Sequence, residues 1–341
     1  MGEGIPVTVV TGFLGSGKTT FLNRILNQGP TSQQMGQMAV IVNEIGAVGL
    51  DHRLVKHISD NVVLLESGCI CCTVRGELVN ALRDLFMAAL HKKIPVFSRV
   101  LIETTGLADP APIIYTLRYE RFLSERYCYD GCISVLDAVY GRQHLDRHPE
   151  AMQQLALADA IVISKTDLAR ADALAELKGV IGQVNEGAPC YDMQSLPPLS
   201  SLLQASSFRN ATVAPRKAVG GAQGFSTAIA RPVAAHHAQI QVLTLATERQ
   251  ITRSSFIKSI SRLQEQLGAQ LLRLKGAVYF QGEGRASVVQ GVHQQLYPLE
   301  PLGAEHEVQE PGKTALVLIL RGALPPGIET QLHELLFGVR E

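Results

Sequence analysis

Short apolar runs alternate with amphipathic stretches over about the first two hundred residues of this chain. Six of these runs are rich in valine and isoleucine and have the length of strands that are buried on both faces of a sheet. The stretches between them carry apolar residues at helical spacing. This alternation predicts a doubly wound, mostly parallel α/β sheet. The predicted strands are Val7–Thr11, Ala39–Val42, Val62–Leu65, Val100–Thr104, Ile133–Leu136 and Ala160–Ser164, and the predicted helices include Lys18–Gln28 and Arg75–Ala89.

A different pattern begins near residue 195. Between Ser195 and Gly224 the composition shifts to Ser, Ala, Pro and Gly with little periodicity, which is typical of a linker. Beyond it, alternating strands and two helices predict a smaller α+β domain. We therefore expect a first domain over 1–204, a linker over 205–238 and a second domain over 239–341. The later strands are Gln239–Leu245, Leu271–Phe280, Arg285–Val292 and Leu316–Arg321, and the helices are Ser254–Leu267 and Glu329–Phe337.

Length and charge agree with this organisation. The 341 residues exceed a typical domain of about 100–150 residues. Basic and acidic residues balance at 31 each, so no net charge draws the chain to nucleic acid or to anionic lipid. No apolar run reaches the ~20 residues of a membrane span, and the first residues lack the pattern of a secretory signal. We expect a cytoplasmic protein without nucleic-acid or membrane partners.

The strongest chemical signal follows the first predicted strand. Gly12–Thr19, here called the phosphate loop, matches G-x-x-x-x-G-K-[ST] between a strand and a helix. Its glycines let backbone N–H groups face phosphates, and the helix N-terminus adds positive potential. Lys18 can reach the β and γ phosphates, and Thr19 offers a hydroxyl to Mg²⁺. The alternative is a glycine-rich turn with an incidental lysine. The predicted nucleotide contacts are Gly12, Gly15, Ser16, Gly17, Lys18, Thr19 and Thr20.

A second motif bears on the base. Ser164–Asp167, here called the base loop, ends a predicted strand and resembles the guanine-specifying N-K-x-D motif, with Ser164 in place of asparagine. The Asp167 carboxylate can accept two hydrogen bonds that guanine donates and adenine cannot. The stem of Lys165 would lie against the base. GTP is favoured over ATP, although an ordinary exposed Lys and Asp after a strand is the alternative.

Three of the six cysteines, Cys69, Cys71 and Cys72, cluster between a predicted strand and a predicted helix. A helix N-terminus favours the thiolate, which is the form that binds metal. Thiolates select soft ions such as Zn²⁺, Co²⁺ or Cu⁺ over Mg²⁺. The spacing is unlike a secreted disulfide framework. A redox pair of Cys69 with Cys72, or simple packing of small residues in a turn, are the alternatives.

Taken with NEIG at 43–46, ETTG at 103–106 and RLKG at 273–276, these motifs resemble the CobW-type family of metallochaperone GTPases. These GTPases are relatives of the hydrogenase and urease nickel-insertion GTPases, and the resemblance covers nearly the whole chain. It implies a transition-metal site coupled to the nucleotide, and a second switch in which Gly106 senses the γ-phosphate and Glu103 acts near Mg²⁺. The implied metal ligands are Glu44, Cys69, Cys71 and Cys72, and the implied catalytic residues are Lys18, Thr19, Glu103 and Gly106.

The resemblance also implies a function. A GTP- and Mg²⁺-dependent protein would deliver zinc or cobalt to a client metalloprotein or cofactor-assembly enzyme, with slow intrinsic hydrolysis. Related GTPases often pair across the nucleotide, so a homodimer is a further expectation. Ala47 replaces a carboxylate that many relatives carry, and only His236 and His237 stand where many relatives have a longer histidine-rich loop. A metal buffer or sensor, a thiol redox switch and an ATP-dependent P-loop enzyme are the competing hypotheses.

Overall fold

The computed structural model divides into two compact units. It describes residues 4–27, 37–43, 62–67, 74–204, 229–232, 240–293, 295–296, 299–302, 312–322 and 325–338. Of these, the first unit runs to His144 and adds Ala158–Ala175 and Cys190–Leu203. The second unit takes Leu145–Leu157, Glu176–Pro189 and the chain from Gln204 onward. The chain therefore passes from one unit to the other several times before residue 204.

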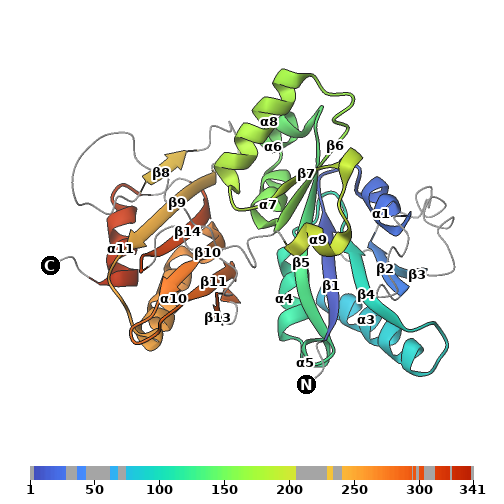
Figure 1. Cartoon of the computed structure of the whole chain (residues 1–341), viewed down its shortest axis with the longest axis horizontal. Helices are drawn as coiled ribbons and strands as arrows, with labels where there is room; N and C mark the ends of the chain where they lie inside the picture. The colour runs from blue at the N-terminus through green and yellow to red at the C-terminus, as the bar shows by residue number, and fades with distance from the viewer. Residues whose placement is uncertain are drawn as a thin grey trace. The chain divides into compact units, whose positions relative to one another are not determined.

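A seven-stranded sheet forms the centre of the first unit. Its strand order is β3-β2-β4-β1-β5-β6-β7, and every neighbouring pair is parallel, as Figure 1 shows. The predicted doubly wound sheet is confirmed, with one additional strand at its edge. The strands are β1 (Ile5–Thr11), β2 (Gln37–Asn43), β3 (Val62–Ser67), β4 (Phe97–Glu103), β5 (Tyr127–Asp137), β6 (Ala160–Ser164) and β7 (Cys190–Asp192).

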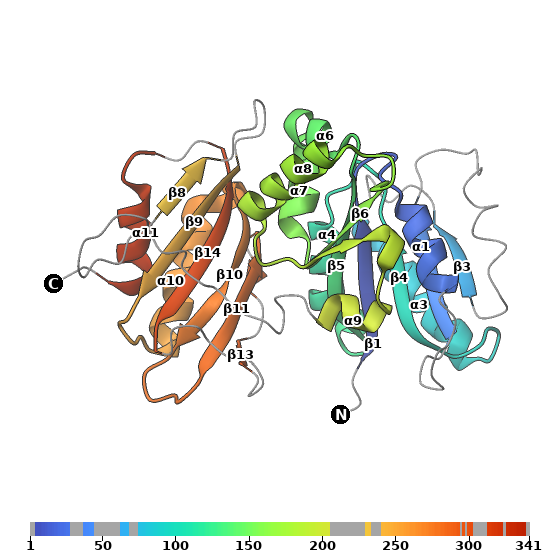
Figure 2. The same ribbon diagram turned by 45° about the horizontal axis from the view of Figure 1, so that its top comes forward.

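Helices cover both faces of this sheet (Figure 2). Apolar residues of α1 and α9 form one core with the strands, in which Phe21 and Leu202 are fully buried. On α3, Leu78, Leu82 and Leu85 are buried, as their helical spacing predicts. The helices are α1 (Lys18–Asn27), α3 (Val74–Leu90), α4 (Ala111–Tyr119) and α5 (Arg121–Ser124), while α6 (Gly141–Arg147), α8 (Ala171–Val184) and, by its last residue, α9 (Leu199–Gln204) begin in this unit and end in the other.

Strand register brings four loops to one edge of the sheet. In a parallel sheet the carboxyl ends of the strands point the same way, and ligands bind beyond them. The last residue of β4 pairs with the residue before the end of β1, the last residue of β1 pairs with a residue three before the end of β5, and the last residues of β5 and β6 pair with each other. The phosphate loop, the residues after β4, those after β5 and the base loop therefore emerge side by side. The paired residues are Val10 with Glu103, Thr11 with Ser134, and Asp137 with Ser164.

The second unit is built on an antiparallel sheet in the order β12-β11-β10-β14-β9-β8, with β13 paired to β11. Helices α10 and α11 pack on it around the buried residues Phe256, Phe280 and Leu332. The α+β prediction for this part of the chain is confirmed. Its elements are β8 (Ile229–Pro232), β9 (Ile240–Thr247), α10 (Arg253–Leu267), β10 (Leu271–Tyr279), β11 (Ala286–Val292), β12 (Gln295–Leu296), β13 (Glu300–Pro301), β14 (Thr314–Arg321) and α11 (Ile328–Phe337).

The second unit also contains α7 (Pro149–Leu157) and the last part of α8. Seven successive residues of α7, Ala151 to Leu157, are buried. The Arg273 guanidinium on β10 donates to the Leu157 carbonyl at the end of α7, and Lys275 Nζ lies 3.1 Å from Asn185 Oδ1. These contacts account for the grouping of α7 with the later strands.

Most of the predicted linker lies outside the described residues, as do His236 and His237. Within 205–238 the structure describes only β8. The domain limits at 204 and 239 therefore stay a prediction. No helix among the described residues combines the length and apolar character required to cross a membrane.

Candidate functional site

The phosphate loop holds three glycines in conformations with positive φ. Gly12, Gly15 and Gly17 have φ angles of 143°, 69° and 96°. A Cβ added at Gly12 would lie 2.3 Å from the carbonyl oxygen of Val135 on β5, so the close approach of the two chain segments requires glycine there. At Gly15 a Cβ would meet nothing within 4 Å. The loop is thus packed against the sheet at Gly12 and open at Gly15, as a cradle for phosphate requires.

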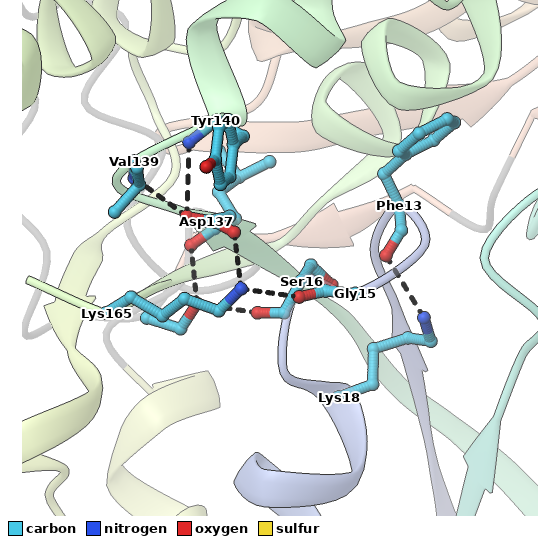
Figure 3. Close-up of polar contacts among 10 residues, drawn as sticks. Phe13, Gly15, Ser16, Lys18, Asp137, Val139, Tyr140 and Lys165 are labelled. Atoms are coloured by element: carbon cyan, nitrogen blue, oxygen red, sulfur yellow. Dashed lines mark hydrogen bonds and ion pairs between the residues drawn. The ribbon is translucent and has the colours of Figure 1, made fainter. Parts of the chain in front are cut away.

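Lys18 lies inside this loop. Its ammonium donates to the carbonyl oxygen of Gly12 at 3.0 Å, and the residue is only 9% exposed. It also donates to the carbonyl oxygen of Phe13 at 3.2 Å (Figure 3). Because the charge lies at the N-terminal end of α1, phosphate oxygens held by the loop would come within its reach. The arrangement fits a nucleotide whose phosphates bind at Gly12–Thr19.

Thr19 and Glu103 meet beside Lys18. The Thr19 hydroxyl donates to Glu103 Oε1 at 3.1 Å, and Glu103, the last residue of β4, is 5% exposed. A hydroxyl next to a buried carboxylate is an oxygen donor set that suits Mg²⁺. The chemistry of this pair fits the ion that accompanies a nucleoside triphosphate.

Gly106 lies against the phosphate loop. A Cβ at this position would approach the backbone nitrogen of Leu14 to 2.6 Å. The contact brings the turn after β4 to the loop that would carry the phosphates. Of the other predicted contacts, Ser16 is buried and Thr20 is exposed on the first turn of α1.

The base loop is fastened directly to the phosphate loop. Ser164 Oγ lies 2.6 Å from the carbonyl oxygen of Ser16, and Lys165 Nζ donates to the Gly15 carbonyl at 2.9 Å. Ser164, which replaces the family asparagine, therefore still connects the two loops. Figure 3 shows the Lys165 amino group between the Gly15 carbonyl and the carboxylate of Asp137.

Asp137 is a site residue that the sequence reasoning missed. Its carboxylate accepts from Lys165 Nζ at 2.6 Å and from the backbone N–H groups of Val139 and Tyr140 at 2.7 and 3.2 Å. The side chain is 1% exposed. An acidic residue at the end of a buried strand was the available signal, because this edge of a parallel sheet is where ligands bind.

A second set of missed residues surrounds Asp167. Gln194 Nε2 donates to Asp167 Oδ1 at 3.2 Å, and the neighbouring Thr166 hydroxyl donates to Asp192 Oδ1 at 2.9 Å. Both partners come from the segment that ends β7. No pattern in the sequence pointed to them, because β7 has only three residues and no strand was predicted there.

The predicted transition-metal ligands Glu44, Cys69, Cys71 and Cys72 lie outside the described residues, as does Ala47. Within the described ranges, no group of three or more His, Cys, Asp or Glu side chains is placed to hold a metal ion. The assignment of these four ligands stays a prediction.

Known protein families match both parts of the chain. Residues 6–192 match the description CobW/HypB/UreG, nucleotide-binding domain. The chain belongs to this family. Residues 240–336 match the cobalamin synthesis protein cobW C-terminal domain. The CobW resemblance inferred from the motifs is confirmed, and with it the P-loop fold of the first sheet.

Several CobW relatives are named for zinc. The zinc chaperone YjiA of Escherichia coli (strain K12) is 34% identical over 295 residues, which are 86% of this chain and 87% of YjiA. The zinc chaperone CobW of Pseudomonas aeruginosa is 31% identical over 208 residues, covering 52% of this chain and 53% of that protein. The zinc-regulated GTPase metalloprotein activator 1 of Schizosaccharomyces pombe is 32% identical over 188 residues, or 53% and 44% of the two chains. The crystal structure of Zn(II)-bound YjiA GTPase from E. coli aligns over the whole of both chains with a TM-score of 0.70 and 27% identity.

Proposed function

We propose that this protein is a GTP-binding and GTP-hydrolysing metallochaperone that carries zinc to a client. The proposal rests on the convergence of the phosphate loop, Glu103, Asp137 and the base loop at one edge of the parallel sheet. Loops that meet in this way supply phosphate, magnesium and base contacts from a single direction. The relatives named as zinc chaperones support the choice of cargo.

Guanine is the base that the site supports best. Asp167 is exposed, so its carboxylate is accessible to a ligand. The N1–H and exocyclic amine of guanine are both donors, whereas adenine presents an acceptor at N1. Lys165, held by Asp137 and the Gly15 carbonyl, would lie along the base plane. GTP is therefore the proposed substrate.

Hydrolysis would depend on groups already gathered at the phosphate loop. Lys18 would exchange its two carbonyl partners for phosphate oxygens, and Thr19 with Glu103 would hold Mg²⁺, which neutralises charge on the phosphates when it is bound. Gly106 lies close to Leu14, and its backbone N–H would sense whether the γ-phosphate is present. The phosphate loop, the ETTG segment and the base loop contain no glutamine or arginine to orient water or to neutralise developing charge, so a slow intrinsic rate is expected.

The proposed cargo site comprises Glu44, Cys69, Cys71 and Cys72. Three thiolates and a carboxylate suit Zn²⁺ or Co²⁺, and the names of the relatives favour zinc over cobalt. GTP would favour the state in which these ligands come together, and hydrolysis would release the ion. The same proposal includes delivery of the ion to a client metalloprotein, which would bind residues 239–341. It also includes a cytoplasmic location and a homodimer.

The test is zinc affinity measured with a non-hydrolysable GTP analogue, with GDP and without nucleotide. Linkage requires the factor by which the analogue strengthens zinc binding to equal the factor by which zinc strengthens analogue binding. Equal zinc affinities in all three states would remove the switch from the proposal.

Two variants and one control variant separate the parts of the proposal. Cys72→Ser should weaken zinc binding, whereas Cys190→Ser, which changes an exposed cysteine outside the cluster, should leave it intact. Lys18→Ala should abolish the effect of nucleotide on zinc. Zinc binding by the wild type could instead be independent of nucleotide and equally tight in Lys18→Ala. The protein would then be a metal buffer or sensor.

A further inference from the structure

A continuous hydrogen-bonded relay connects the helix after the phosphate loop to the base-reading carboxylate. Arg24 on α1 donates through Nη2 to Gln194 Oε1 at 2.8 Å. The amide of the same glutamine donates through Nε2 to Asp167 Oδ1 at 3.2 Å. The three side chains come from α1, from the segment after β7 and from the base loop, so tertiary structure alone brings them together.

The chemistry of the relay permits only one orientation of Gln194. A guanidinium is purely a donor, and an ionised carboxylate is purely an acceptor. The glutamine amide must therefore present its oxygen to Arg24 and its nitrogen to Asp167. A rotated amide would oppose donor to donor and acceptor to acceptor, so Arg24 fixes the group that contacts Asp167.

The backbone around Gln194 is also held in place. Its N–H donates to Asp192 Oδ1 at 2.8 Å, and the same oxygen accepts from the Thr166 hydroxyl at 2.9 Å. Arg24 additionally donates through Nη1 to the carbonyl of Met193. The segment 192–194 is thus tied to the base loop at two neighbouring residues and to α1 through one arginine.

We propose that Gln194, oriented by Arg24, is a positioning residue that holds the Asp167 carboxylate in the plane needed to accept both guanine donors. The inference rests on the proposed binding of guanine nucleotides and assigns part of its base specificity to a residue outside the base loop. The terminal torsion of an aspartate is broad, so an unsupported carboxylate rotates readily. Each carboxylate oxygen can accept more than one hydrogen bond, so the contact with Gln194 leaves room for the base.

This role affects two nucleotides differently. GDP offers both N1–H and the exocyclic amine, whereas inosine diphosphate (IDP) offers only N1–H. A carboxylate that rotates can still accept one hydrogen bond but rarely two in a fixed plane. Loss of Gln194 should therefore lower the affinity for GDP more than the affinity for IDP. General damage to the fold would lower both affinities alike.

The experiment measures dissociation constants of GDP, IDP and ADP for the full chain and its variants. For Gln194→Ala we expect GDP affinity to fall about 3- to 10-fold, as for one net hydrogen bond, and the preference for GDP over IDP to shrink. Arg24→Met should act in the same direction. The double variant should show less than the sum of the two effects in free energy, because the two side chains act through one contact.

The matched control is Gln183→Ala, an exposed glutamine on α8, which should bind all three nucleotides as the wild type does. An unchanged GDP-to-IDP preference in both Gln194→Ala and Arg24→Met would overturn the positioning role. A wild-type protein that binds ADP as tightly as GDP would instead overturn the guanine-nucleotide function on which it rests.

Discussion

Lys165 has a backbone φ of 55°, a region that residues other than glycine seldom occupy. The conformation carries a modest steric cost, of the order of 1 kcal/mol, and it aims the amino group at Asp137 and at the Gly15 carbonyl. An ion pair with a carboxylate that is 1% exposed offsets that cost. The base loop is therefore held by a residue on a different strand.

Asp137→Asn tests this support. An asparagine can still accept from the N–H groups of Val139 and Tyr140 but no longer pairs with the Lys165 charge. We expect GDP affinity to fall about 10-fold, since a hydrogen bond to a charged group contributes roughly 1.5–3 kcal/mol. Fluorescent GDP binding measures the change. Asp172→Asn, which removes an exposed carboxylate paired with Arg170, should leave the affinity intact, and an equal fall in both variants would contradict the prediction.

Tyr127 gives a prediction about pH. Its hydroxyl donates to the Leu82 carbonyl at 2.8 Å, and burial holds the pKa of Tyr127 well above its ordinary value of about 10. Because the folded state retains this proton, the associated stability is complete below pH 10 and is lost as the pH rises through the folded pKa.

Tyr127→Phe should therefore lower the unfolding free energy by about 1 kcal/mol at pH 7. Above pH 10 the difference should shrink by up to ~1.4 kcal/mol per pH unit, because only the wild type carries the buried ionisable group. Urea unfolding at several pH values measures it. Tyr140→Phe changes a tyrosine that is 55% exposed and should show no such trend. A Tyr127→Phe deficit that persists unchanged at high pH would count against burial as the cause.

At the scale of single residues, the sequence predicts the site residues that lie close together in one motif. Gly12 and Lys18 stand in one motif, and the structure brings them to one loop. Asp137 and Gln194 contact Lys165 and Asp167 from positions 28 and 27 residues away in the chain, so no spacing rule could identify them.

Among the elements, β10 explains why the motif RLKG has this composition. A Cβ at Gly276 would lie 2.2 Å from the carbonyl oxygen of Ala315 on the neighbouring β14, so only glycine fits between the strands. Arg273 and Lys275 alternate along β10 and contact the end of α7 and Asn185, whereas Leu274 belongs to the core under α10. The motif is accounted for by packing without any catalytic role.

Arg273→Met tests the contact with α7. The residue is 2% exposed, and its guanidinium meets a carbonyl at a helix C-terminus, where a cation is favoured. Methionine keeps much of the length of the arginine side chain but has no N–H group to donate to the Leu157 carbonyl. The unfolding free energy should therefore fall by about 1–3 kcal/mol. Chemical denaturation measures the loss. Arg285→Met, at an exposed position before β11, serves as the control, and equal effects would refute the assignment.

Element prediction succeeded where the chain has a short run of β-branched apolar residues, as in β6, or apolar residues at helical spacing, as in α10. Strand β6 was predicted with its observed limits, and α10 within one residue. Helix α7 has no amphipathic pattern because residues 151 to 157 are all buried, and β7 is too short for any periodicity. Both elements were missed for these reasons.

The two compact units of the whole molecule are interleaved along the chain. Residues 145–157 and 176–189 group with the strands that follow residue 240, although they precede the predicted boundary at 204. Sequence composition marks the polar segment after Ser195 but carries no information about which earlier helices pack with the later sheet. The limits at 204 and 239 stay a prediction from composition, while residues 145–157 and 176–189 group with the later strands.

A chain that ends after Gln204 should therefore be less stable than its length suggests. It would lack β10, against which α7 packs, and the apolar residues of α7 would lose part of their cover. We expect a lower urea midpoint and stronger binding of a hydrophobic dye. The control is the full chain cleaved at a protease site inserted within 205–228, which retains both parts. A truncated chain as stable as this control would refute the expectation.

The position of Lys18 on its own loop bears on which nucleotides the protein can recognise in a cell. An incoming ligand must draw the ammonium away from two peptide oxygens. GMP has no second or third phosphate with which to compete, so it would meet the base loop while the lysine stayed where it is. The arrangement would thus filter out monophosphates without any additional residue.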